Sequence, residues 1–443
     1  MKISKIQEFV QRYHVLLLVA SLLLVFAVET FVISQRHLSL SEGISSTWWM
    51  IVKNVESGRG YKACDIKYVP NCDLTDQTTA MREPVPVLFF ALVGILTHNS
   101  TLAFQVSQLI FNLLICLFMY LLGRELGSPT LGLVAAFGWA IYLHAVHTVL
   151  HINGDLMAGF FVLAGVLALT QALKKRTVGR WILFGILFGL AVLSRSSTVL
   201  VFLVLAAGSI VYLRRTGMLQ SEWHKPLLAA VLFGLVLLPW VVRNEMVFGK
   251  PVWGTTLVGY NLYRFNAIVM IEVPPHYVGP SEGYGEIQTL VAQTPELRRP
   301  INEARVDEIL QKKALNLIRT HPEEYAELVA FRFIPLWFNI GILDQYGETP
   351  MIIDDLIVLQ QAILLAAFLF ALWKADWYLR LLAAGALFFM LGYLAVDAQL
   401  RYMVTIMPVI IVISAAGIHR FFLRDDPGRG VEQFRETEQI TPG

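Results

Sequence analysis

Charge is scarce in this sequence. Asp, Glu, Lys and Arg make up 15% of the 443 residues, whereas 56% are hydrophobic, and soluble domains average nearer 25% charged residues. Length alone would suggest a soluble protein of two or three domains, but repeated apolar runs of about 20 residues favour a polytopic membrane protein. The net charge of +2 gives no indication of a nucleic-acid partner.

Cysteine is scarce too, and metal-binding patterns are absent. Of the three cysteines, Cys116 lies in an apolar run and is typical of an inert core residue. Cys64 and Cys72 share one polar loop, where a disulfide forms if the loop faces an oxidising compartment. The histidines at 144, 147 and 151 recur on one helix face without an HExxH-type pattern, which favours the lining of a wet cavity over a metal site. No metal and no cofactor is predicted.

Long apolar runs are what the sequence has in abundance, and they predict an all-α integral membrane protein of about ten transmembrane helices. The basic start, MKISKIQEFVQRYH, leads into an apolar run without a small-residue cleavage site. We therefore interpret this run as an uncleaved first span rather than a signal peptide. The ten predicted spans are residues 15–33, 101–122, 130–150, 155–173, 181–197, 198–213, 226–242, 353–373, 380–396 and 402–419.

The distribution of Lys and Arg predicts the orientation of these spans. Basic residues gather in the alternate segments 1–14, 123–129, 174–180, 214–225, 374–380 and 420–443, whereas the opposite short turns contain only Arg195 and Arg401. The positive-inside rule then places both termini in the cytoplasm of a bacterial-type inner membrane. The predicted parts are a catalytic membrane module (1–242), an outer segment (243–352), C-terminal membrane helices (353–420) and a cytoplasmic tail (421–443).

Two long segments, residues 34–100 and 243–352, face outward in this topology. WWMIVKNV in the first is typical of a helix at headgroup level, and the apolar run 87–96 is too short to span. In the second, the stretch from Arg305 to Phe338 predicts a helix, a break at His321–Pro322 and an amphipathic helix that lies on the membrane. These segments predict a helical layer on the outer face.

Carboxylates near the outer face are candidate functional groups, because an ionisable group in a membrane is costly unless it is paired or wet. Asp155 follows a short outer turn, where it could either cap the next helix or serve a site. Glu29 lies near the outer end of the first span, where snorkelling to the interface is the alternative to a function. Four more lie in the first outer loop, where solvated charge is the default: Glu42, Asp65, Asp73 and Asp76.

Three arginines also fall at outer ends of spans, against the positive-inside trend. They are Arg195, Arg243 and Arg401, and each needs a partner. A carboxylate of an outer loop would serve, as would an anion such as a lipid phosphate, which suits the planar guanidinium. Cations and carboxylates at one membrane face favour a site for a negatively charged lipid head.

Six segments of the chain form a recognisable series. They are VESGRGY (55–61), AMREPVPVLFFAL (80–92), GDLMAGFFVL (154–163), GLAVLSRSSTVL (189–200), residues 237–266 beginning LLPWVVRNEMVFG, and LRYMVTIMPVIIVISAAG (400–417). In this order they resemble the GT-C superfamily of membrane glycosyltransferases, and specifically the bacterial relatives of protein O-mannosyltransferases and the lipid A aminoarabinose transferase. The second segment, for example, resembles the family's "xRxPGYPxFLAL", with Pro84-Val85-Pro86 in place of its Pro-Gly-Tyr-Pro.

The resemblance implies transfer of a sugar from a polyprenyl-phosphate donor to an acceptor at the outer face, usually with inversion. It implies a general base in the first outer loop, for which Glu42 is the first choice although its spacing departs from the family pattern. Asp65, Asp73, Asp76 and Glu29 are alternatives. Asp155 takes the place of a second acid, and Arg82 that of a phosphate-contacting cation. Arg243, Arg401 and Arg195 are secondary candidates for the lipid phosphate.

The expected partners are membrane lipid, the polyprenyl-phosphate sugar and an acceptor that is a protein, a lipid or another glycan. Two other readings stay open, a lipid or solute transporter and a catalytically silent family member. The sequence shows no internal repeat of the kind found in inverted-repeat transporters.

Overall fold

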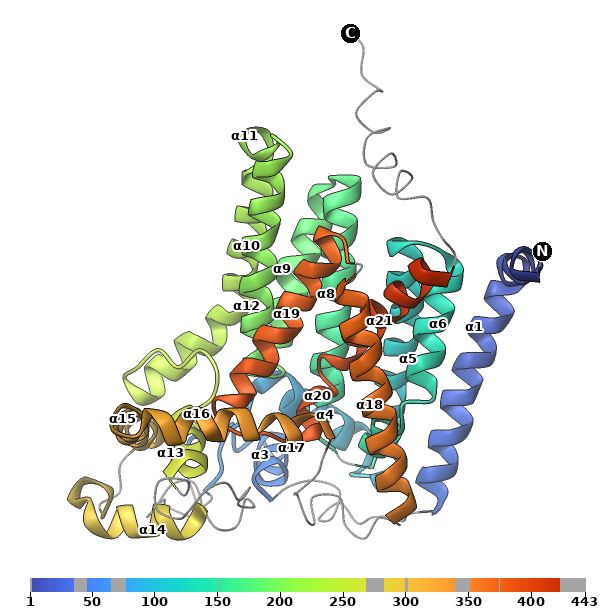
Figure 1. Ribbon diagram of the computed structural model, residues 1–443. Helices are drawn as coiled ribbons and strands as arrows, with labels where there is room; N and C mark the ends of the chain where they lie inside the picture. The colour runs from blue at the N-terminus through green and yellow to red at the C-terminus, as the bar shows by residue number, and fades with distance from the viewer. Residues whose placement is uncertain are drawn as a thin grey trace.

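The structure is a computed structural model that describes residues 2–35, 46–64, 77–150, 152–267, 283–298, 302–338, 351–373 and 375–422. These residues are helical almost throughout, and the extended pairing among them is an isolated antiparallel bridge between Lys62 and Thr78. The helices form two parts, a bundle of long apolar helices and a layer of shorter helices across one end of it (Figure 1).

Apolar helices build the bundle, and many of their large apolar side chains are exposed on its outside, as contact with lipid requires. Within it, α5 packs against α6 and α8, and α9 packs against α8 and α12. The bundle helices are α1 (Lys2–Gln35), α5 (Thr101–Leu126), α6 (Pro129–Ala140), α7 (Leu143–Thr148), α8 (Asp155–Lys175), α9 (Val178–Val192), α10 (Val199–Arg215), α12 (His224–Phe248), α18 (Met351–Trp373), α19 (Trp377–Leu394) and α21 (Met407–Phe422).

Among the described residues, seven helices are long and apolar enough to cross a membrane, so the fold class is confirmed and the count of about ten is not. The other three predicted spans contain shorter apolar helices. The predicted span 181–197 corresponds to α9 with 15 residues, and 402–419 corresponds largely to α21 with 16.

The predicted span 130–150 is broken after Ala140, with α6 on one side and α7 on the other. Gln360 of α18 fills the break, because its Nε2 donates to the Ile141 carbonyl at 2.8 Å and its Oε1 accepts from the Leu143 amide at 3.0 Å. A side chain 217 residues away thus satisfies backbone groups that an unbroken helix would have paired internally.

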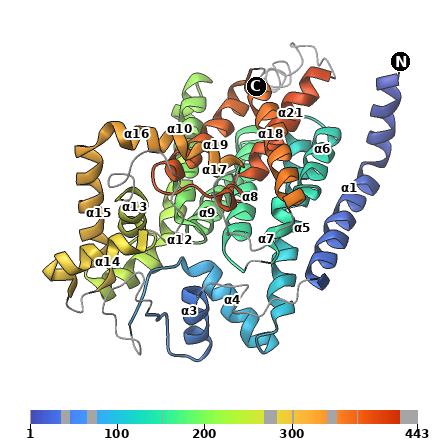
Figure 2. The same ribbon diagram turned by 60° about the horizontal axis from the view of Figure 1, so that its bottom comes forward.

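The layer lies across the lower end of the bundle in Figure 1, opposite the start of α1 and the turn at α11 (Leu219–Glu222). Figure 2 shows α3 and α4 beside α5 in one part of the layer, and α13 to α16 in another. Its elements are α3 (Ser46–Glu56), α4 (Pro84–Thr97), α13 (Val258–Ala267), α14 (Gly283–Gln293), η3 (Pro295–Arg298), α15 (Glu303–Thr320), α16 (Pro322–Phe331), α17 (Phe333–Phe338) and α20 (Leu400–Met403).

The predicted helices of the two long segments are confirmed in this layer. α3 contains the WWMIVKNV stretch. α15 ends at Thr320, and after the cap residue His321, Pro322 begins α16. The layer has a hydrophobic core of its own, in which Trp48 and Phe90 belong to the same cluster as Tyr260 and Leu310. This core joins the two long segments to each other on one side of the bundle.

Candidate functional site

Three chain segments meet where the layer touches the bundle: the start of α4, the start of α8 and the turn after α9. The Val85 amide donates to the Leu193 carbonyl at 3.1 Å. A Cβ on Gly154 would lie 2.8 Å from Cγ of Pro86 and 2.9 Å from the Ser194 carbonyl oxygen. Glycine at 154 therefore allows the backbone before Asp155 to approach the other two segments closely.

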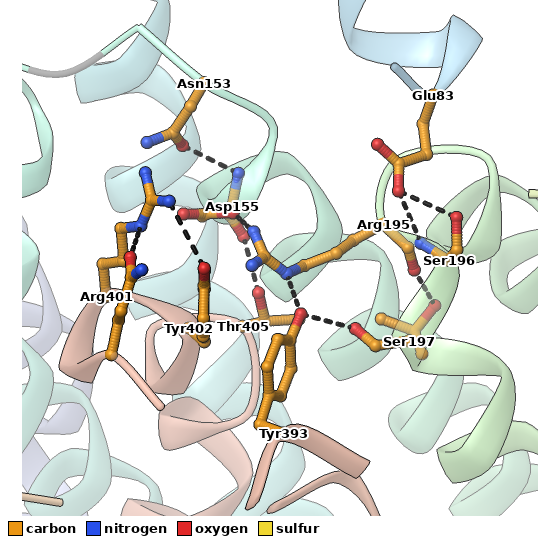
Figure 3. A network of polar contacts seen from close by, with 12 residues as sticks. Glu83, Asn153, Asp155, Arg195, Ser196, Ser197, Tyr393, Arg401, Tyr402 and Thr405 are labelled. Carbon is orange, nitrogen blue, oxygen red and sulfur yellow. Dashed lines mark hydrogen bonds and ion pairs between the residues drawn. The ribbon is translucent and has the colours of Figure 1, made fainter. Parts of the chain in front are cut away.

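Asp155 lies at this junction as the first residue of α8, with 2% of its surface exposed. Its carboxylate forms an ion pair with the Arg195 guanidinium from the turn after α9 (Figure 3). The capping alternative is wrong, since the N-cap residue of α8 is Gly154 and Asp155 already belongs to the helix. Asn153 Oδ1 instead accepts from the Asp155 amide at 2.9 Å, which leaves the carboxylate for the arginine.

The Arg195 guanidinium rests on two tyrosines of the C-terminal helices. Its Nε donates to the hydroxyl of Tyr393, and its centre lies 4.6 Å from the ring centroid of Tyr402. The two rings stack with centroids 4.4 Å apart. Hydrogen bonding and cation–π contact fix the direction of the guanidinium, and the ion pair thereby joins α8 to α19 and α20.

In Figure 3, Arg401 lies beside Asp155 on the side away from Arg195, and Tyr402 lies below Asp155 between the two arginines. The Tyr402 hydroxyl donates to Asp397 Oδ2 at 2.6 Å, and burial raises the pKa of Asp397. Gln399 donates to the same oxygen and accepts from Nε of Arg401 at 2.6 Å. Because the Arg401 side chain is exposed, this chain of contacts holds a cation at the edge of the site, where an anion can reach it.

Arg82 lies two residues before α4, next to the N-cap residue Glu83. Its guanidinium lies 6.0 Å from the Trp48 ring centroid, and its carbonyl accepts from the Tyr61 hydroxyl at 2.9 Å. Arg82, the predicted phosphate-contacting cation just before α4, thus faces Trp48 of α3.

Arg243 belongs to a different network, which joins α12 to the chain segment before α4. Its guanidinium donates to the carbonyl oxygens of Thr79 at 2.8 Å and Tyr61 at 3.1 Å. Beside it, Glu303 accepts from the hydroxyls of Thr79 and Thr256 and from the Ala80 amide. Burial raises the pKa of Glu303 to about 7. These contacts fix the extended chain that leads to Arg82.

Glu29 is buried where α1 packs against α5. It is 2% exposed on α1 and forms a hydrogen bond with Asn112 of α5, so the snorkelling alternative is wrong for this side chain. The other predicted acids, Glu42, Asp65, Asp73 and Asp76, lie outside the described residues.

The predicted histidine face is described in part. His144 is buried and His147 half-buried, and His151 lies outside the described residues. Across the described part of the chain, no three His, Cys, Asp or Glu side chains gather as a metal site would need. Cys64 takes part in a disulfide, while Cys72 lies outside the described residues.

Sequence reasoning missed the tyrosines at 393 and 402, Asp397 and Glu303. Tyr402 and Asp397 flank Arg401 in the stretch DAQLRYM, so a conspicuous arginine at an outer helix end was the available signal. Glu303 gave no signal, because an acid in the first turn of an amphipathic helix is ordinarily a solvated, dipole-stabilising residue.

Comparison with known proteins gives a family match over part of the chain. The family model of dolichyl-phosphate-mannose-protein mannosyltransferases matches residues 81–242, which include Arg82, Asp155 and Arg195. The comparison with curated proteins gives no match.

Two solved structures are similar to the chain. The archaeal oligosaccharyltransferase AglB from Archaeoglobus fulgidus, in complex with an inhibitory peptide and a dolichol-phosphate, has a TM-score of 0.55 at 17% identity, over 96% of this chain and 52% of AglB. ArnT from Cupriavidus metallidurans, bound to undecaprenyl phosphate, has a TM-score of 0.40 at 12% identity, over 91% of this chain and 77% of ArnT. The chain thus spans about half the length of the archaeal enzyme. The family match over residues 81–242 agrees with the resemblance seen in the sequence, and the chain shares the fold of the archaeal enzyme.

Proposed function

We propose that this protein transfers a sugar from a polyprenyl-phosphate donor to an acceptor at the extracytoplasmic face of a bacterial-type inner membrane, with inversion at the anomeric carbon. The observation that carries the proposal is the convergence of Asp155, Arg195, Tyr402 and Arg401 at the end of the bundle that the layer covers. Both termini would then be cytoplasmic, as the Lys and Arg distribution predicts.

Asp155 is proposed to orient the acceptor hydroxyl or the sugar. Its ion pair with Arg195 fixes the direction of the carboxylate in a mostly buried site. Removal of the acceptor proton falls to a carboxylate of the first outer loop, with Glu42 as the first candidate. An alcohol is too weak a nucleophile unaided, and a positioned base contributes about 10²–10⁴-fold.

Arg401 and Arg82 are proposed to bind the donor phosphate, because a phosphate that gains charge as the sugar leaves is stabilised by guanidinium donors. Arg401 suits this role through its exposure beside Asp155. Arg243 and Arg195 are weaker candidates, since their donors already engage backbone carbonyls and Asp155 respectively.

The test is transfer from radiolabelled polyprenyl-phosphate sugar in proteoliposomes that contain the full chain. We expect Asp155→Asn and Glu42→Gln each to lower the rate by about 100-fold. Glu296→Gln removes an exposed carboxylate of the layer and serves as the matched control, with the wild-type rate expected. Full activity of both site variants would refute the assignment, and movement of lipid or solute without transfer would favour a transporter.

A further inference from the structure

Glu83 joins the start of α4 to the turn that carries Arg195. Its Oε1 accepts from both the amide and the hydroxyl of Ser196, at 2.9 and 2.8 Å (Figure 3). Glu83 occupies the N-cap position of α4 but makes no cap bond to its own helix. Its carboxylate therefore binds a segment 113 residues away, and bonds to an ionised acceptor are stronger than neutral ones.

Ser196 begins η1 (Ser196–Thr198), and Arg195 is the extended residue just before it. On the other side, the Arg195 carbonyl accepts from the Thr198 hydroxyl at 2.8 Å. Glu83 thus fixes the peptide group that follows Arg195, within one residue of the guanidinium that pairs with Asp155.

The position of Glu83 is itself rigid. Pro84 follows it, both Pro84 and Pro86 are buried, and the Val85 amide bonds to Leu193 just before the same turn. Two contacts from one end of α4, at Val85 and Glu83, therefore bracket the backbone between Leu193 and Ser196. A shift of α4 would move the turn with it.

We propose that Glu83 is a positioning residue that holds Arg195 in register with Asp155. It does so by accepting hydrogen bonds from the amide and the hydroxyl of Ser196. Through these bonds the position of α4, which Arg82 precedes, is coupled to the Asp155–Arg195 ion pair. The expected effect on kinetics rests on the proposed function, whereas the expected effect on stability rests only on contacts within the chain. The kinetic and the structural effects are therefore tested separately.

The kinetic test measures sugar transfer by Glu83→Gln, Ser196→Ala, Arg195→Lys and the double variant Glu83→Gln/Arg195→Lys. We expect kcat to fall about 10-fold for Glu83→Gln, which corresponds to about 1.4 kcal/mol of activation free energy, with the KM for the donor unchanged. Ser196→Ala keeps the amide donor and loses less. The double variant should be no slower than Arg195→Lys alone, because Glu83 acts through Arg195.

The structural test needs no activity and uses the same four proteins with Glu296→Gln as control. We expect Glu83→Gln to lower the melting temperature of the detergent-solubilised chain by about 2–4 °C. Its effect should shrink in the Arg195→Lys background. Additive melting shifts, or a Glu83→Gln enzyme with wild-type kcat, would overturn the inference. An inactive wild type with coupled melting shifts would refute the proposed function and leave the inference standing.

Discussion

Two buried carboxylates, Asp155 at the end of the bundle and Glu303 within the layer, are bound by different kinds of partner. Glu303, 1% exposed, accepts from two hydroxyls and an amide of the layer. Asp155, 2% exposed, pairs charge to charge with a guanidinium that rests on tyrosine rings. Both carboxylate oxygens of Glu303 accept hydrogen bonds from neutral donors, so this residue has a structural role. The Asp155–Arg195 pair lies beside the exposed Arg401. An exposed cation next to a buried ion pair is what distinguishes the candidate site from the structural contacts of Glu303.

Removing the cation from the Asp155 pair should give the largest effect. Arg195→Met leaves a buried carboxylate without its charge partner, and we expect about 3–5 kcal/mol of destabilisation. Thermal and denaturant unfolding in detergent would measure it. Asp155→Asn/Arg195→Met removes both charges and should recover much of the loss. A single variant as stable as the wild type would mean that the pair adds no stability.

The pH dependence of stability should show that Glu303 is a buried carboxylate bound by neutral donors, in contrast to the ion-paired Asp155. Burial raises its pKa from the ordinary 4.5 to about 7, so the folded chain binds more protons than the unfolded chain between these values. Stability should therefore fall as pH rises from about 4.5 through about 7, by on the order of 3 kcal/mol. Unfolding across this range should show the slope, and Glu303→Gln should flatten it while sugar transfer continues. A variant with an unchanged slope would contradict this.

Closer to the site, Gly154→Ala tests the junction that brings Asp155 to Arg195. Its Cβ would lie too near Pro86 and the Ser194 carbonyl, and we expect about 1–3 kcal/mol of destabilisation together with slower transfer. Gly234→Ala is the matched control, because no atom lies within 4 Å of the added Cβ. Equal stability of the two variants would show that the junction tolerates a side chain.

The smallest change removes one hydroxyl. Tyr393→Phe loses the contacts with Nε of Arg195 and with the Ser197 hydroxyl at 2.8 Å but keeps the ring stacked on Tyr402. We expect about 1 kcal/mol of destabilisation and a modest fall in kcat, measured by unfolding and by sugar transfer. A loss as large as that of Arg195→Met would show that the hydroxyl, rather than the ion pair, holds the arginine.

Sequence patterns predicted the parts of the fold that depend on local chemistry. The break at His321–Pro322 was predictable because proline cannot continue the preceding helix. The break after Ala140 was not, because it is stabilised by Gln360 from α18, and no local signal announces a partner so far along the chain.

The same contrast holds for the site. Asp155 and Arg195 were both identifiable as charges out of place at a membrane face. The sequence left open whether Asp155 caps a helix or serves a site, and whether Arg195 pairs with an outer-loop carboxylate or with a lipid phosphate. Glu83 stood next to Arg82 in the sequence, and its hydrogen bonds go instead to Ser196.

The sequence by itself determined that this chain is a helical membrane protein, which of its segments are apolar, and which charged residues lie at the ends of those segments. The tertiary structure decided which charge meets which: Asp155 with Arg195, Glu303 with the chain before Arg82, and Glu83 with the turn at Ser196. The physical reason is that hydrophobicity and helix propensity act within a segment. Pairing of buried charges depends on distances across the bundle, and packing alone sets those distances.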